Sequence, residues 1–237
     1  MRTRLKLGYL FAACGLFFTS AISSALAENV TVVELFTSQG CAACPPADEY
    51  FATLTDMADV VPLALHVDYW DYIGWKDAFA NPRFTERQRA YARMNHSRTI
   101  YTPQFIINGK DRIEGLNPAE TAERLASHLN RPSPVQISVQ QDGAHLHVVL
   151  DADPPLDHPA LVELVRYLPK RTVTIENGEN AGKTVTYRNI VTSWKTLEEW
   201  SGQDRLEFEA EIEGTEPAVI IVQRPGPRTI LAAASPG

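Results

Sequence analysis

The sequence predicts two domains: an α/β domain at residues 28–130 and a C-terminal antiparallel β domain, sandwich-like, at residues 131–237. Before Asn130, apolar runs typical of buried strands alternate with helical patterns, which is the order of an α/β domain. After Pro134, short β-rich segments follow one another with turn signals between them, as in a sandwich. The stretch "NRPSP" between them is the expected linker.

The first 27 residues are expected to be a signal peptide and not part of the fold. Three basic residues precede the apolar run Leu7 to Phe18, and Ala25-Leu26-Ala27 forms a small-x-small cleavage site. An uncleaved anchor and a lipoprotein attached at Cys14 are the alternatives. Cleavage predicts a protein exported to the periplasm or the extracellular space, with no stable membrane insertion afterwards.

The charge of the chain argues against one class of partner. Loss of Arg2, Arg4 and Lys6 with the signal would take the formal net charge from −7 to −10. An acidic protein is a poor general binder of nucleic acid, so no nucleic-acid partner is expected. The hydrophobic content of 44% indicates an ordinary globular core.

The α/β domain is expected to contain three helices, two buried strands and a hairpin. Proline has no backbone N–H and suits the first turn of a helix, so Pro45-Pro46 and Asn81-Pro82 indicate helix starts. Asn108-Gly109 is typical of a hairpin turn. The expected elements are a strand at 29–36, a helix from Pro45 to about Asp56, a strand at 60–68, a helix at 82–94, a hairpin of 102–109 with 111–114, and a helix from Asn117 to about Asn130.

The β domain is expected to be built from short strands separated by turns. Turn signals include Asp142-Gly143, Asn177-Gly178 and Ser201-Gly202. The expected strands are "VQISVQ", "HLHVVL", "ALVELVRYL", "RTVTIE", "KTVTYRNIV", "LEFEAEIE" and "AVIIVQ".

The cysteine count points to chemistry and not to a structural staple. Of three cysteines, Cys14 would leave with the signal, so only Cys41 and Cys44 remain. A disulfide between them would close a loop of four residues. By chain entropy such a loop contributes about 2 kcal/mol, against about 4 to 5 kcal/mol for a loop of 100 residues.

The position of the pair favours thiol–disulfide exchange. Cys41 is expected at the N-terminus of a helix, directly after a strand, where the helix dipole favours a thiolate. Cys41, expected to be the more exposed, is then the nucleophile, and Cys44 resolves the mixed disulfide.

Two further segments are expected to shape the site. Thr102-Pro103 is either a plain trans strand start or a cis-proline loop that packs against the cysteines and presents a backbone edge to substrate. In "HVDYWDYIGW", Trp70 is expected on an aromatic rim that shapes substrate access, or else in packing between the domains. His66 is a candidate proton carrier or metal ligand, or a satisfied strand histidine.

"CAAC" at a helix start, with "TP" before a later hairpin, resembles the thioredoxin fold. The stretches "VVELFTSQGCAACPPAD", "HVDYWDYIGWKDAFA" and "ENAGKTVTYRNIVTSW" are more closely similar to the DUF1223 family of exported bacterial proteins with a thioredoxin-like domain. The resemblance implies a thioredoxin-like fold and redox character. It also suggests Glu34, in the first strand, as a buried carboxylate acting as base for Cys44; the alternative is that Glu34 faces solvent or pairs with a basic residue.

Several residues have weaker functional interpretations. Asp48 and Glu49 would oppose a low thiolate pKa if they face Cys41, and Ala42-Ala43 leaves the direction of electron flow open. The arginines of residues 82–98 are either a surface for an acidic partner or a solvated face. His145 and His147 share one face of a strand, as metal ligands or as surface residues.

Three functions remain as hypotheses. The first is a thiol–disulfide oxidoreductase without a cofactor, whose partners are protein thiols or disulfides. The second is a copper-binding protein that uses Cys41, Cys44 and His66, because two thiolates with a histidine suit Cu(I). The third is a non-catalytic binding protein in which the β domain carries the function.

Overall fold

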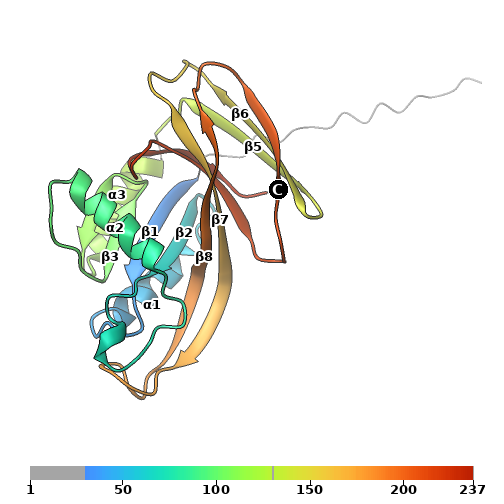
Figure 1. Ribbon diagram of the computed structural model, residues 1–237. Helices are drawn as coiled ribbons and strands as arrows, with labels where there is room; N and C mark the ends of the chain where they lie inside the picture. The colour runs from blue at the N-terminus through green and yellow to red at the C-terminus, as the bar shows by residue number, and fades with distance from the viewer. Residues whose placement is uncertain (1–29, 130, 237) are drawn as a thin grey trace, which may run out of the picture.

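The computed structural model describes residues 30–129 and 131–236, so the predicted signal peptide with Cys14 lies outside the described residues. The chain forms one eight-stranded mixed sheet and a separate three-stranded antiparallel sheet, with helices on the larger one (Figure 1). The elements are β1 (Thr31–Thr37), α1 (Pro45–Leu54), β2 (Val60–His66), η1 (Asp71–Ile73), α2 (Pro82–Met94), β3 (Gln104–Ile107), β4 (Asp111–Glu114), α3 (Pro118–Leu129), β5 (Val135–Asp142), β6 (His145–Ala152), β7 (Ala160–Thr174), β8 (Thr184–Trp200), β9 (Leu206–Glu211), β10 (Ala218–Gln223) and β11 (Ile230–Ala234).

The first half has the predicted order of strand, helix, strand, helix, hairpin and helix. β1 and β2 pair in parallel, β3 runs antiparallel to β1, and every residue of β1 and β2 is buried. Helices α1 and α3 pack on one face of these strands, while α2 covers the other together with β10 and β11. Near-continuous apolar strands therefore correspond to a sheet covered on both faces.

The helices begin where the prolines predict. Pro45 and Pro46 open α1, and Pro82 opens α2. The side chain of Asn81 accepts a hydrogen bond from the backbone N–H of Arg83 and so caps α2.

The strands after residue 130 divide between the two sheets. The order of the large sheet is β11-β10-β7-β8-β2-β1-β3-β4. Within it β8 lies beside β2 in parallel, with Ala64 opposite Ile190. The large sheet therefore continues across the predicted domain boundary. The segments "ALVELVRYL" and "RTVTIE", expected as two strands, form the single long strand β7.

The smaller sheet forms the sandwich-like part of the fold. Its order is β5-β6-β9, and its inner face packs on residues of β7, β10 and β11. The core between the layers includes Ile137, Val148, Val162 and Ile220, all at most 1% exposed.

The long antiparallel hairpin of β7 and β8 carries C-terminal residues to the first half of the chain. Its lower end runs past α1, away from the smaller sheet (Figure 1). Residues 175–183 form the tip of this hairpin, between Thr174 and Thr184. Among the residues that the structure describes, no helix combines the length and the apolar character that crossing a membrane requires.

Candidate redox site

Cys41 and Cys44 form a disulfide directly after β1, with their Cα atoms 5.4 Å apart. Cys44, and not Cys41, occupies the N-cap of α1, because Pro45 and Pro46 fill the first helical positions. Cys41 lies one turn earlier, and its carbonyl accepts a hydrogen bond from the N–H of Cys44. The prediction that Cys41 stands at the helix N-terminus was therefore wrong by one turn.

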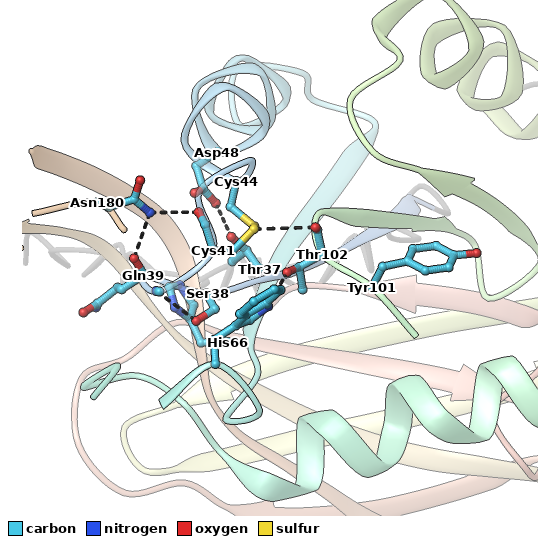
Figure 2. The surroundings of a disulfide bond; sticks show 12 residues. Thr37, Ser38, Gln39, Cys41, Cys44, Asp48, His66, Tyr101, Thr102 and Asn180 are labelled. Carbon is cyan, nitrogen blue, oxygen red and sulfur yellow. Dashed lines mark hydrogen bonds between the residues drawn. A yellow bond between two sulfur atoms is a disulfide. The ribbon is translucent and has the colours of Figure 1, made fainter. Parts of the chain in front are cut away.

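Both cysteines are buried, although Cys41 is slightly the more exposed of the two, as the sequence predicted. Cys41 is 2% exposed, whereas Cys44 is fully buried. The sulfur of Cys41 lies 3.5 Å from the carbonyl oxygen of Thr102 (Figure 2). Attack on this sulfur by another thiol requires the surrounding residues to move.

Thr102, Pro103 and Trp70 meet beside this disulfide. The peptide bond between Thr102 and Pro103 is cis. The indole N–H of Trp70 donates a 2.7 Å hydrogen bond to the hydroxyl of Thr102. The two segments that the sequence singled out are therefore joined on the Cys41 side of the disulfide.

The aromatic segment also packs on the loop that precedes Cys41. A Cβ atom at Gly40 would lie 3.1 Å from the Cβ of Trp70, so this position favours glycine. The indole N–H of Trp75 donates to the side-chain oxygen of Gln39 at 2.8 Å. Tyr72, by contrast, is 81% exposed.

Glu34 is fully buried but lies on the face of β1 that α2 covers. Its carboxylate accepts hydrogen bonds from Arg87 at 2.7 and 3.1 Å and from the hydroxyl of Tyr91 at 2.5 Å. Side chains alternate across a strand, so Val33 and Leu35 face α1 whereas Glu34 faces α2. This is the alternative in which Glu34 pairs with a basic residue, and the geometry does not support a role as base for Cys44.

Asp48 is the buried carboxyl that lies beside the cysteines (Figure 2). Its position four residues after Cys44 puts both side chains on one face of the first helical turns. Burial raises the pKa of Asp48 to about 7, against the lowering effects of His66 and of the Thr37 hydroxyl. Thr37 donates to Oδ1 at 2.9 Å, while Oδ2 has no hydrogen-bond partner among the described residues.

The sequence contained the signal that identifies Asp48, namely the spacing of four from Cys44 on a proline-initiated helix. From the sequence, Asp48 is expected only to oppose a low thiolate pKa if it faces Cys41. Because burial raises the pKa of Asp48 to about 7, this carboxyl has the pKa of a group that accepts or donates a proton near neutral pH.

His66 lies at the end of β2, opposite Thr37 of β1, and is fully buried. Its Nδ1 is 2.7 Å from Oδ2 of Asp77, and Nε2 has no partner among the described residues. Burial acts to raise the pKa of Asp77, but the attraction to His66 and the hydrogen bonds from His66 and from the backbone of Gln39 and Phe79 together outweigh burial, so this pKa lies below its usual value. The rings of Phe79 and Tyr187 pack against His66.

The residues considered as metal ligands are not grouped as a metal site requires. Within residues 30–129 and 131–236, no three His, Cys, Asp or Glu side chains are arranged to bind one ion. Nδ1 of His66 is bonded to Asp77. His147 lies on the smaller sheet, where its Nε2 is 3.4 Å from a carboxylate oxygen of Glu207.

The arginines of α2 differ from one another in their environment. Arg87 points inward to Glu34 and lies over the ring of Trp194, 3.6 Å from its centroid. Arg89 is exposed and pairs with Glu86 of the same helix. Only part of this set therefore belongs to a solvated face.

Asn180, at the tip of the β7–β8 hairpin, is a site residue that sequence reasoning missed. It is 1% exposed, and its side-chain amide donates to the carbonyls of Gln39 at 3.0 Å and Cys41 at 2.8 Å (Figure 2). Lys183 in turn donates to Oδ1 of Asn180 at 2.8 Å. The stretch "ENAGKTVTYRNIVTSW" contributed to the family resemblance, but nothing in it indicates which residue reaches the cysteines.

The fold and the site define a mixed α/β protein with a Cys-x-x-Cys disulfide at the carboxyl end of a central strand. The chain belongs to the family described as "Protein of unknown function (DUF1223)", which matches residues 32–223. The family resemblance inferred from the sequence is thus confirmed. No curated protein matches the chain.

Two solved structures are similar to this chain. Protein AGR_C_4864 from Agrobacterium tumefaciens is 31% identical, with a TM-score of 0.75, and the match covers 88% of this chain and 94% of that one. HBP35 of Porphyromonas gingivalis is 14% identical, with a TM-score of 0.64 over 90% of this chain and 76% of that one. The second similarity concerns the fold alone.

Proposed function

We propose that the protein is an exported thiol–disulfide oxidoreductase whose first half is thioredoxin-like. The observation that carries the proposal is the Cys41–Cys44 disulfide, which has the Thr102 carbonyl on one side and the buried Asp48 carboxyl within one helical turn. A pair that closes so short a loop contributes little to stability, whereas catalytic dithiols combine close sulfurs with a proton acceptor.

In the reducing direction, the Cys41 thiolate attacks one sulfur of a substrate disulfide. The substrate S–S bond breaks, a mixed disulfide forms at Cys41, and the first substrate thiolate leaves. Cys44 then attacks the Cys41 sulfur, which releases the second substrate thiol and forms the disulfide seen here. The pair has lost two electrons and the substrate has gained them, and oxidation of a substrate follows the same steps in reverse.

Asp48 is the group proposed to accept the proton of Cys44 during the second step. A carboxyl with a pKa of about 7 is deprotonated in a large fraction of molecules at neutral pH yet remains a useful base. Its unpartnered Oδ2 has a free position for that proton. Glu34 takes no part in this scheme, because Arg87 and Tyr91 already occupy its oxygens.

Thr102, Pro103 and Trp70 are proposed to contact the substrate. The Thr102 carbonyl lies beside the Cys41 sulfur and offers a backbone acceptor to an extended peptide next to the reacting bond. A protein thiol or disulfide is the partner that this arrangement favours. No bound cofactor is needed for the exchange itself.

Trapping of the mixed disulfide tests the proposal. The reduced mature Cys44→Ser variant, mixed with glutathione disulfide in one sample and with a cystine-containing peptide in another, is expected to accumulate a one-to-one adduct at Cys41 in each, visible by mass spectrometry. The Cys41→Ser variant should form far less adduct, because Cys44 is fully buried. Absence of an adduct in both variants would instead favour a binding protein in which the pair is structural.

A further inference from the structure

Asn180, at the tip of the β7–β8 hairpin, bonds to the redox loop, residues 38–44 between β1 and α1. Both hydrogen bonds from the Asn180 amide end on backbone carbonyls of that loop, at Gln39 and Cys41. Nearly 140 residues separate these partners in sequence, so the contact depends on the C-terminal half of the fold.

We infer that Asn180 is a positioning residue that sets the equilibrium between the dithiol and the disulfide. The inference rests on the proposed function and assigns the hairpin a role in it. Asn180 fixes the backbone of the residue that carries the nucleophile, and Lys183 orients the amide by donating to its oxygen. The Asn180 amide bonds to backbone carbonyls of Gln39 and Cys41 and so acts on the cysteine through the loop.

The two Asn180 hydrogen bonds should shift the equilibrium between dithiol and disulfide, because they restrict the two states to different extents. In the oxidised site the S–S bond already closes the loop, so the two hydrogen bonds restrict it little further. In the dithiol they keep the Cys41 backbone near Cys44 and reduce the entropy lost when the ring closes. Asn180 therefore favours the disulfide, and its loss should make the pair easier to reduce.

The packing of the hairpin tip supports a fixed position for Asn180. Gly178 has a φ of +79°, and a Cβ atom there would lie 3.2 Å from the Cβ of Trp75. Trp75 itself donates to the side chain of Gln39. The tip, the aromatic segment and the redox loop are thus in mutual contact.

The test compares Asn180→Ala with Asn177→Ala in the mature protein. Asn177 lies in the same tip but is exposed, so its variant is the matched control. Each protein is equilibrated with glutathione and glutathione disulfide, and free thiols are trapped by alkylation. At equilibrium the protein dithiol gives two electrons and two protons to one glutathione disulfide, which yields two glutathione molecules.

We expect the equilibrium constant for disulfide formation to fall about tenfold in Asn180→Ala, a rise in reduction potential of about 30 mV. Asn177→Ala should match the wild type. Values for Asn180→Ala within about twofold of the control would overturn the inference. If that variant does not unfold cooperatively, Gly178→Ala, which keeps the Asn180 side chain but displaces the tip that carries it, should give a shift of the same sign, and no shift there would also overturn the inference.

The same experiment separates this inference from the proposed function. A wild-type potential in the catalytic range with an unchanged Asn180→Ala variant refutes only the positioning role. A very low wild-type potential that rises in Asn180→Ala refutes the oxidoreductase and leaves Asn180 as a residue that stabilises a structural disulfide.

Discussion

At the scale of single residues, the most unusual group is Asp48, a carboxyl buried beside a disulfide. Its pKa rises from 3.8 to about 7, chiefly because burial penalises the charged form. The folded state therefore binds a proton that the unfolded state releases between about pH 4 and pH 7, and stability falls as the pH rises through this window.

The first prediction concerns this pH dependence. As the pH rises from about 4 to about 7, deprotonation of Asp48 should lower the free energy of unfolding by about 4 kcal/mol, since one pKa unit corresponds to about 1.4 kcal/mol. Asp48→Asn should remove most of this fall, as measured by urea unfolding at pH 4, 6 and 8. Parallel profiles for the two proteins would show that Asp48 has an ordinary pKa.

Trp70 gives a second prediction at this scale. Trp70→Phe keeps an aromatic side chain but removes the indole N–H that bonds to Thr102, so the loop beside Cys41 should open more often. A loss of about 1 kcal/mol corresponds to roughly a fivefold faster reduction of the disulfide by dithiothreitol. Tyr72→Phe, at an exposed position of the same segment, is the control and should react like the wild type. Equal rates in all three proteins would exclude this role for the Trp70 hydrogen bond.

At the scale of elements, the buried cluster around Glu34 joins β1, α2 and β10. Arg87 bonds to Glu34 and to the side chain of Gln223, and Tyr91 bonds to Glu34. Burial acts to lower the pKa of Arg87, but the charge of Glu34, the hydrogen bond to it and the other neighbours in the cluster together outweigh burial, so this pKa lies above its usual value. The cluster thus stabilises the contact between helix and sheet on the face away from α1.

This arrangement predicts a structural effect of Glu34→Gln. The variant leaves the guanidinium of Arg87 without its counter-charge, so the free energy of unfolding should fall by about 3 kcal/mol. Arg89→Gln, which breaks an exposed pair on the same helix, should cost less than about 1 kcal/mol. The rate at which Cys44 resolves a mixed disulfide should stay unchanged in Glu34→Gln. A slower rate with unaltered stability would restore Glu34 as the base.

Local patterns predicted the elements of the first half well, because prolines, an Asn-Gly turn and apolar runs act over a few residues. The same patterns did not identify long-range partners. Glu34 and Asp48 are both carboxyls near the cysteines in sequence, and only the face that each side chain occupies separates their roles. Asn180 reaches the site through a hairpin whose direction no local signal specifies.

At the scale of the whole molecule, the large sheet links both halves of the chain. β8 lies beside β2, and residues of β7, β8 and β10 share a core with β1 and α2. A sandwich-like second layer is present, as the alternating strands predicted, but its partner layer belongs to the same sheet as the redox site.

A truncation tests this dependence. A fragment of residues 28–130 would lose β8 beside β2 and the apolar residues Val165, Val191, Val219 and Ile221 that cover one face of the sheet. We predict that it lacks a cooperative thermal transition, whereas residues 28–237 unfold cooperatively. A cooperatively folded fragment would mean that the first half is an independent domain.

The central claim is that Cys41 and Cys44 exchange electrons with other thiols, and their reduction potential tests it most directly. The mature protein is equilibrated in glutathione or dithiothreitol buffers, and free thiols are alkylated and counted by mass. We predict a midpoint between about −270 and −120 mV, the range of catalytic dithiols. A midpoint well below about −300 mV would contradict it, because the disulfide would then be an inert structural bond.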